Sequence, residues 1–106
     1  MPRIYQPKKN NPYYIRDSLY MYIIMCVRNA YPYITNEYSI EELTDTMKKE
    51  IEIVRKNIEA LPEDSKDAVI DSVLTESAYP KGSNKKTLSL IKSLFIYNIA
   101  KDFYLI

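Results

Sequence analysis

Hydrophobic and polar residues follow a helical period in four stretches of this chain. The most regular stretch spans residues 40–61, where apolar side chains recur every three or four positions. They form one stripe along about six helical turns, made by Ile40, Leu43, Met47, Ile51, Val54, Ile58 and Leu61. Ser39 and Glu42 provide a capping-box pattern at its start. The pattern predicts a helix over 40–61.

The longest helical pattern of the second half runs from Lys85 to the final residue and predicts a helix over 85–103. Its core stripe consists of Leu88, Ile91, Phe95 and Ile99. A polar face opposite this stripe covers the first two turns and contains Lys85, Lys86, Ser89, Lys92 and Ser93. Leu90 and Leu94 open a second apolar flank, and the apolar end at 103–106 is expected to be buried.

Two further helices are predicted over 17–31, ending before Pro32, and over 63–76, beginning after Pro62. The interior of the first, from Leu19 to Val27, is apolar around nearly its whole circumference. Such a helix is central in a fold or is shared between a core and a partner. Because so short a chain rarely covers all sides of one helix, we expect a homodimer. The candidate protein-interface residues are Met21, Met25, Leu90 and Leu94.

These elements predict an all-α fold, a compact bundle of about four helices in a single domain over 1–106. Three prolines within residues 1–15 predict an extended basic arm before the bundle. The link before the last helix contains Gly82, where we expect a positive φ, and ends at the potential caps Ser83 and Asn84. The last two helices have the outline of a shortened helix-turn-helix.

Composition argues against most catalytic chemistry. Histidine is absent, and Cys26 and Gly82 are the only residues of their kinds. This disfavours zinc sites, nucleophile–base pairs and glycine-rich phosphate loops. The carboxylates Glu41, Glu42 and Asp45 fit a solvated helix start better than a metal site. We therefore expect no enzymatic activity, no cofactor, no metal and no small-molecule substrate.

The chain also lacks an obvious membrane or export segment. Its longest apolar run has nine residues, about half of a membrane span, and no signal-peptide core precedes it. We therefore expect a bacterial cytoplasmic location. Ile, Lys, Tyr and Asn are abundant, and their codons are rich in A and T. This suggests a low-GC Gram-positive bacterium or its phage as the source.

Charge is divided along the sequence even though the net charge is only +1. Residues 1–36 carry five basic and one acidic residue, 37–79 carry five and twelve, and 80–106 carry five and one. The basic ends either share a face that meets a polyanion or pack against the acidic middle. The candidate nucleic-acid-binding residues are Arg3, Lys8, Lys9, Lys85, Lys86, Thr87 and Lys92.

Two blocks of the sequence carry a family resemblance. One is Leu61-Pro-Glu-Asp, Val69-Ile-Asp-Ser, Tyr79-Pro-Lys, Thr87, Lys92, Phe95-Ile-Tyr, Ile99-Ala-Lys and Leu105-Ile106; the other is Asn11-Pro-Tyr-Tyr-Ile, Leu19-Tyr and Arg28. Together they resemble the RinA/ArpU-type late-gene transcriptional regulators of Gram-positive phages and prophages. The resemblance implies an all-helical protein whose last helix contacts DNA through Lys85, Lys86, Thr87 and Lys92.

The chain departs from that pattern in its last helix. Relatives tend to have Trp at the places of Leu88 and Ile91, and Arg at those of Leu90 and Leu94. Leucine cannot contact phosphate or guanine, and it leaves an apolar strip suited to a protein partner. The resemblance and the basic residues support the first hypothesis, a small phage DNA-associated regulator. The apolar strip supports the second, a phage protein–protein interaction module, or an inhibitor of a host nuclease or polymerase such as an anti-defence protein.

Overall fold

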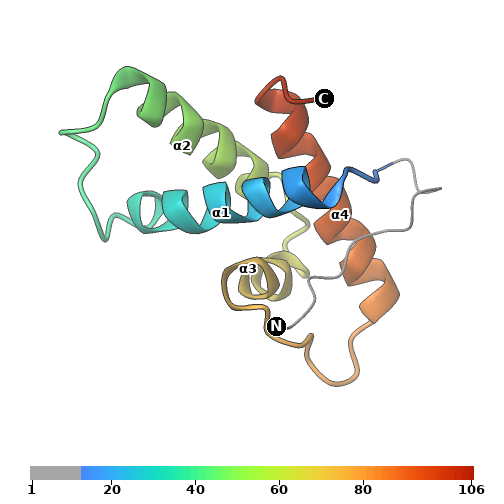
Figure 1. Cartoon of the computed structure of the whole chain (residues 1–106). Coiled ribbons are helices and arrows are strands. Elements are labelled where there is room, and N and C mark those ends of the chain that lie inside the picture. Colours follow the sequence, from blue (N-terminus) through green and yellow to red (C-terminus); the bar gives the residue numbers. More distant parts are fainter. Residues whose placement is uncertain (1–12) are drawn as a thin grey trace.

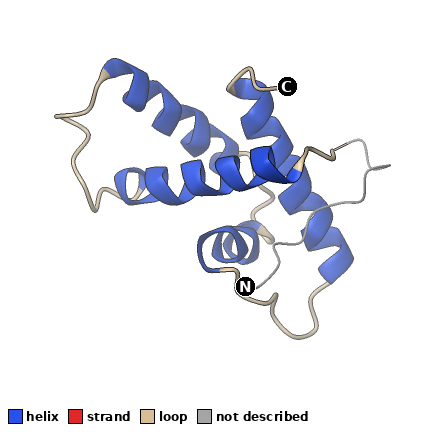
Figure 2. Ribbon diagram, in the orientation of Figure 1, coloured by secondary structure: helices blue, strands red, loops and turns tan. Residues whose placement is uncertain are grey.

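Helix α1 (Asp17–Ile34) is the central element of the fold, and α2 (Asp45–Glu59), α3 (Lys66–Thr75) and α4 (Lys85–Asp102) all pack against it. This architecture is seen in a computed structural model that describes residues 13–106 (Figures 1 and 2). The predicted all-α bundle is confirmed, and the described part of the chain contains no strand. Most of the predicted arm over 1–15 lies outside the described residues.

β-Branched aliphatic side chains make up most of the core, and leucine, alanine and two aromatic side chains complete it. The largest fully buried ones are Ile23, Ile24, Val27, Val54, Val69, Val73, Ile96 and Ile99. Burying each such side chain contributes about 1.5–3 kcal/mol. Isoleucine and valine are only moderate helix formers, so packing against neighbouring helices supplies most of the stability of these helices.

Helix α1 continues through Pro32, so the prediction that it ends before this proline was wrong. The φ of proline is compatible with a helix, and proline lacks only the backbone N–H donor. The last turn tolerates the loss of this donor better than the centre of a helix does. The end is closed by Asn36, whose φ of 62° allows Glu37 N–H to bond Pro32 O at 2.8 Å and Asn36 N–H to bond Tyr33 O at 3.3 Å. This is a Schellman motif with asparagine in the left-handed position.

Helix α2 begins five residues later than predicted, after a long link from α1. Thr44 caps it by accepting a hydrogen bond from Met47 N–H at 3.2 Å. The predicted capping box at Ser39 and Glu42 does not form, because Ser39 Oγ accepts from Glu41 N–H in a local turn. The ends of α1 and α2 diverge toward this link, so residues 35–44 must span the gap rather than extend the helix (Figure 1).

The second half starts with a turn at Pro62, where Ser65 N–H bonds Pro62 O at 3.0 Å, and α3 follows from Lys66. This start is later than the predicted residue 63. Residues 76–84 then connect α3 to α4. Gly82 has the expected positive φ, 82°, and Asn84 caps α4 by accepting from Thr87 N–H at 3.1 Å. The helix-turn-helix character of this pair stays a prediction.

Residues 104–106 are exposed, which corrects the expectation that 103–106 is buried; Phe103 is partly buried against the core. Tyr104 is 94% exposed, while Leu105 and Ile106 are 43% and 50% exposed. Tyr104 takes the left-handed position of a second Schellman motif, with φ 60°. Leu105 N–H bonds Ala100 O at 2.9 Å and Tyr104 N–H bonds Lys101 O at 3.0 Å.

Candidate functional site

A hydrophobic groove, which we call the α1–α2 groove, is lined mainly by side chains of α1 and α2. These two helices diverge toward the link that joins them (Figure 1). The volume of the groove is about 570 Å³. Its lining is mainly aromatic, aliphatic and sulfur-containing, and its principal residues are Tyr22, Met25, Cys26, Tyr33, Tyr38, Met47, Ile51, Val54 and Phe103. This composition is typical of a binding surface, since tyrosine and methionine are enriched at protein interfaces.

The groove exists because the apolar stripe of α2 is covered over only part of its length. Val54 and Ile58 are 1% and 9% exposed, whereas Met47 remains 43% exposed. Ile40, which begins the predicted stripe, lies in the preceding link and is 45% exposed. The first turn of α2 therefore leaves Met47 partly uncovered by the described residues, whereas Ile51, Val54 and Ile58 pack in or against the core.

A second hollow of about 680 Å³ lies on the side of the α1–α2 link. Tyr33, Tyr38 and Ile51 line both hollows. The rings of Tyr33 and Tyr38 meet edge to face, with centroids 5.6 Å apart. Charged side chains of both signs line this second hollow, namely Glu37, Glu41, Glu52, Lys48 and Arg55, and Arg55 forms an ion pair with Glu52. The groove thus has an apolar floor and a margin of mixed charge on its link side.

Cys26 is the thiol that lines the groove. Burial raises the pKa of its thiol, a hydrogen bond from Tyr22 lowers it, and the charge of Glu50 raises it further. The Cys26 charge and hydrogen bond in turn raise the pKa of Tyr22, with Glu50 adding a smaller effect. Glu50 also lines the groove. Both groups are therefore held neutral, and Cys26 is a poor nucleophile here.

The predicted interface residues lie on two helices and are all exposed. Met21 and Met25 on α1 are 40% and 45% exposed. Leu90 and Leu94 on α4 are 49% and 36% exposed. On α1 they belong to a surface that we call the front face, formed by Ser18, Met21, Tyr22, Met25 and Asn29. Met25, Tyr22 and Asn29 also border the α1–α2 groove.

Lys92 does not lie on an exposed polar face, and this prediction was wrong. The residue is 7% exposed, and its Nζ donates to Ser72 Oγ at 2.9 Å across the α3–α4 contact. Burial lowers the pKa of Lys92; the charge of Glu76 opposes this shift and that of Arg28 adds to it. Arg28 itself binds Val73 O at 2.8 Å and lies 3.5 Å from Glu76. Lys92 therefore belongs to a polar junction that joins α1, α3 and α4.

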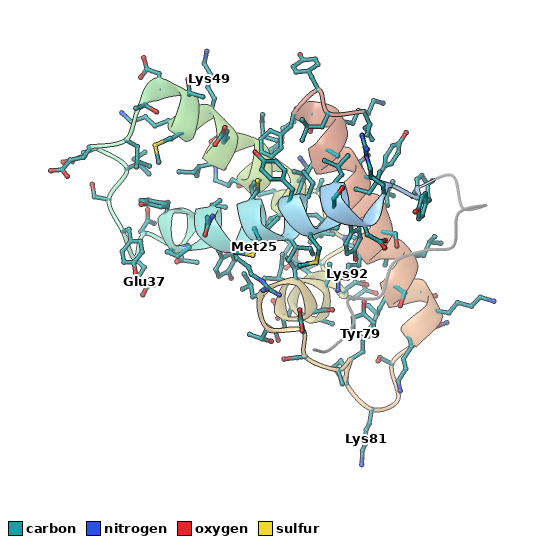
Figure 3. The ribbon with its side chains drawn as sticks, in the orientation of Figure 1. Met25, Glu37, Lys49, Tyr79, Lys81 and Lys92 are labelled. Carbon is teal, nitrogen blue, oxygen red and sulfur yellow. The ribbon has the colours of Figure 1, made fainter. Side chains whose placement is uncertain are left out.

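The other predicted nucleic-acid-binding residues are only partly placed. Lys85, Lys86 and Thr87 are exposed together on the first turn of α4. Lys81, in the preceding link, points away from the body of the protein (Figure 3). Arg3, Lys8 and Lys9 lie outside the described residues. The structure therefore brings together three of the seven predicted residues and removes Lys92 from that set.

Sequence reasoning missed the aromatic residues of the groove, above all Tyr22, Tyr33, Tyr38 and Phe103. Phe103 comes from the end of α4, and its position beside α1 and α2 is a tertiary contact with no local signal. A usable signal did exist in α2. The stripe predicted over 40–61 has about six turns, more than the other helices could cover in so small a protein, although α2 itself has 15 residues, about four turns.

Neither a metal centre nor a membrane span is evident in residues 13–106. No group of three or more potential metal-ligating side chains occurs there, and no helix among them is long and apolar enough to cross a membrane. No protein-family model, curated protein or solved structure matches the chain significantly.

Proposed function

We propose that the protein is a non-enzymatic protein-binding module whose α1–α2 groove accepts an amphipathic helix from a partner. The observation that carries this proposal is the uncovered start of the α2 stripe, which exposes Met47 beside the tyrosines of α1. An apolar groove between two helices is a common way to bind a partner helix through residues spaced three or four positions apart.

The energetics favour such an occupant. Met47 and Tyr22 are 43% and 55% exposed, so a bound helix could remove a large part of each side chain from water. Completing the burial of one such side chain contributes about 1 kcal/mol, since full burial contributes about 1.5–3 kcal/mol. The neutral Cys26 thiol adds no charge that would have to be desolvated.

A displayed library of amphipathic helical peptides tests this function. Selection on the wild-type protein is followed by counter-selection on Met47→Glu, which places a charge in the groove. Leu90→Glu is the matched control, because Leu90 is similarly exposed but lies on α4. We expect peptides that bind wild type and Leu90→Glu, lose binding to Met47→Glu by more than about tenfold, and slow the alkylation of Cys26.

The opposite results would overturn the proposal. They are a selection that yields no peptide preferring wild type to Met47→Glu, or selected peptides that leave Cys26 as reactive as before. Cys26 is a specific reporter because it is the only cysteine of the chain and lines the groove.

DNA association is the second candidate function, favoured by the exposed Lys85 and Lys86 at the capped start of α4. Backbone N–H groups and lysines there suit phosphate contacts. Lys85→Glu with Lys86→Glu should abolish duplex binding at about 50 mM salt, and wild-type binding should weaken steeply at about 200 mM. Wild-type binding that is absent at the lower salt concentration would exclude this function.

Two more specific biological roles stay predictions. A role in late-gene transcription rests on the sequence resemblance and would require the DNA contacts just described. Inhibition of a host nuclease or polymerase would use the groove and the exposed carboxylates Glu37 and Glu41 beside it. In either case a phage or prophage origin is a proposal that rests on composition and resemblance.

A further inference from the structure

Glu50 is the only acidic residue of α2 that has no basic neighbour on its own helix. Side chains three or four positions apart on a helix lie side by side. Asp45, Glu52 and Glu59 each have a lysine or an arginine at such a position. The residues three or four positions from Glu50 are uncharged, namely Thr46, Met47, Ile53 and Val54. The sequence of α2 therefore leaves one carboxylate without local neutralisation.

The tertiary structure does not supply a cation to Glu50 from the described residues either. Glu50 lines the α1–α2 groove, and the front face of α1 beside it carries no charged residue. Arg28 also lines the groove, but its Nε donates to Val73 O at 2.8 Å and its Nη2 lies 3.5 Å from Glu76 Oε1. None of the ion pairs within residues 13–106 involves Glu50. The groove therefore contains one carboxylate that lacks a counter-charge in the described part of the chain.

Tyr22 and Cys26 lie close enough to Glu50 to respond to its charge. Cys26 has the larger effect on Tyr22, and burial has the larger effect on Cys26, but the charge of Glu50 also raises the pKa of both groups. Tyr22 is 55% exposed, so its ring is accessible in the same part of the groove. An aromatic ring and a carboxylate both attract cations. Together they suit an ammonium or guanidinium group.

The desolvation of Glu50 decides which kind of helix the groove favours. A helix that covers Met47 also removes water from Glu50, because the two residues are three positions apart on α2. A carboxylate that loses water without gaining a counter-charge weakens the complex. A basic residue of the partner replaces that water with an ion pair and packs on the ring of Tyr22. The groove therefore favours a basic amphipathic helix over an uncharged or an acidic one.

We propose that the helix bound in the α1–α2 groove carries a lysine or arginine that pairs with Glu50 beside Tyr22. This basic residue lies three or four positions from the apolar residue that covers Met47, which matches the spacing of Met47 and Glu50 on α2. Arginine suits the place best, since its planar group bonds a carboxylate through two N–H groups and stacks on an aromatic ring. The inference rests on the function proposed for the groove.

Parallel selection of the displayed helical peptides on wild type and on Glu50→Gln tests the inference. We expect wild type to enrich peptides with a basic residue three or four positions from an apolar anchor. These peptides should bind Glu50→Gln about tenfold more weakly, and salt should weaken their binding to wild type more than to Glu50→Gln. Glu59→Gln is the matched control and should bind as wild type does. It removes the same charge from α2, and Glu59 pairs with Arg55 and lines neither hollow.

A double-mutant cycle shows whether the peptide's basic residue and Glu50 act on each other. Replacing that residue by glutamine should lower the affinity for wild type about tenfold and the affinity for Glu50→Gln only slightly, because the pair is already broken there. Equal losses on the two proteins, or no enrichment of basic residues, would overturn the inference. Peptides that depend on Met47 but not on Glu50 would also overturn it, while the proposed function of the groove would stand. A selection without any Met47-dependent peptide would overturn both.

Discussion

Replacing Lys92 with methionine is expected to stabilise the protein. The side chain is 7% exposed and makes one hydrogen bond, to Ser72 Oγ at 2.9 Å. Substituting buried charges by apolar side chains of similar volume often stabilises a protein by about 1–4 kcal/mol, since the desolvation cost disappears. The loss of the charge-assisted hydrogen bond opposes this gain in stability, since such a bond contributes about 1.5–3 kcal/mol.

The balance favours the variant for two structural reasons. Ser72 lies in α3, where its hydroxyl can bond a carbonyl of the preceding turn once Lys92 is gone. The neighbouring charges also act on Lys92 in opposite directions, because Glu76 attracts the ammonium group while Arg28 repels it. We expect Lys92→Met to raise the free energy of unfolding by about 1 kcal/mol near neutral pH, with a rise in Tm of about 4–8 °C.

The pH dependence gives an independent check of this reasoning. Because burial lowers the pKa of Lys92, the unfolded chain binds more protons than the folded chain between the lowered pKa and the ordinary value of about 10.4. Wild-type stability therefore gains from Lys92 as the pH rises through that interval, and the advantage of Lys92→Met shrinks there.

Urea unfolding followed by circular dichroism, at several pH values, measures both effects. Lys101→Met is the control, since Lys101 is exposed on the same helix and should change stability by less than about 0.5 kcal/mol. A Lys92→Met protein less stable than wild type by more than about 1 kcal/mol would refute the argument. The hydrogen bond to Ser72 and the attraction of Glu76 would then outweigh desolvation.

Three further predictions concern backbone and groove. Tyr104→Gly should stabilise the protein by about 0.5–1 kcal/mol in thermal unfolding, because Tyr104 has φ 60° and is 94% exposed; Tyr104→Ala should not. Thr44→Ala should cost about 1 kcal/mol of unfolding free energy and Ser39→Ala almost nothing, since only Thr44 caps α2; equal costs would contradict the observed helix start. Glu50→Gln should speed alkylation of Cys26 at about pH 8, because the charge of Glu50 raises the pKa of the thiol; an unchanged rate would show that Glu50 does not act on it.

The helical content and order of the fold were predictable because each helix carries a local signal. Asn84 caps α4 and Gly82 takes a positive φ, as their residue types indicate. The start of α2 was not predictable in this way. Ser39 and Thr44 are both good caps, and only the separation of the ends of α1 and α2 decides between them.

The position of Lys92 shows why the polar face of α4 was predicted wrongly. Lys92 shares its helix side with Ile96 and Ile99, four and seven residues later, and both are fully buried. The polarity of Lys92 favours exposure, whereas the apolar residues on the same side of the helix indicate burial. Leu90 and Leu94, in contrast, were correctly expected to lie away from the core stripe.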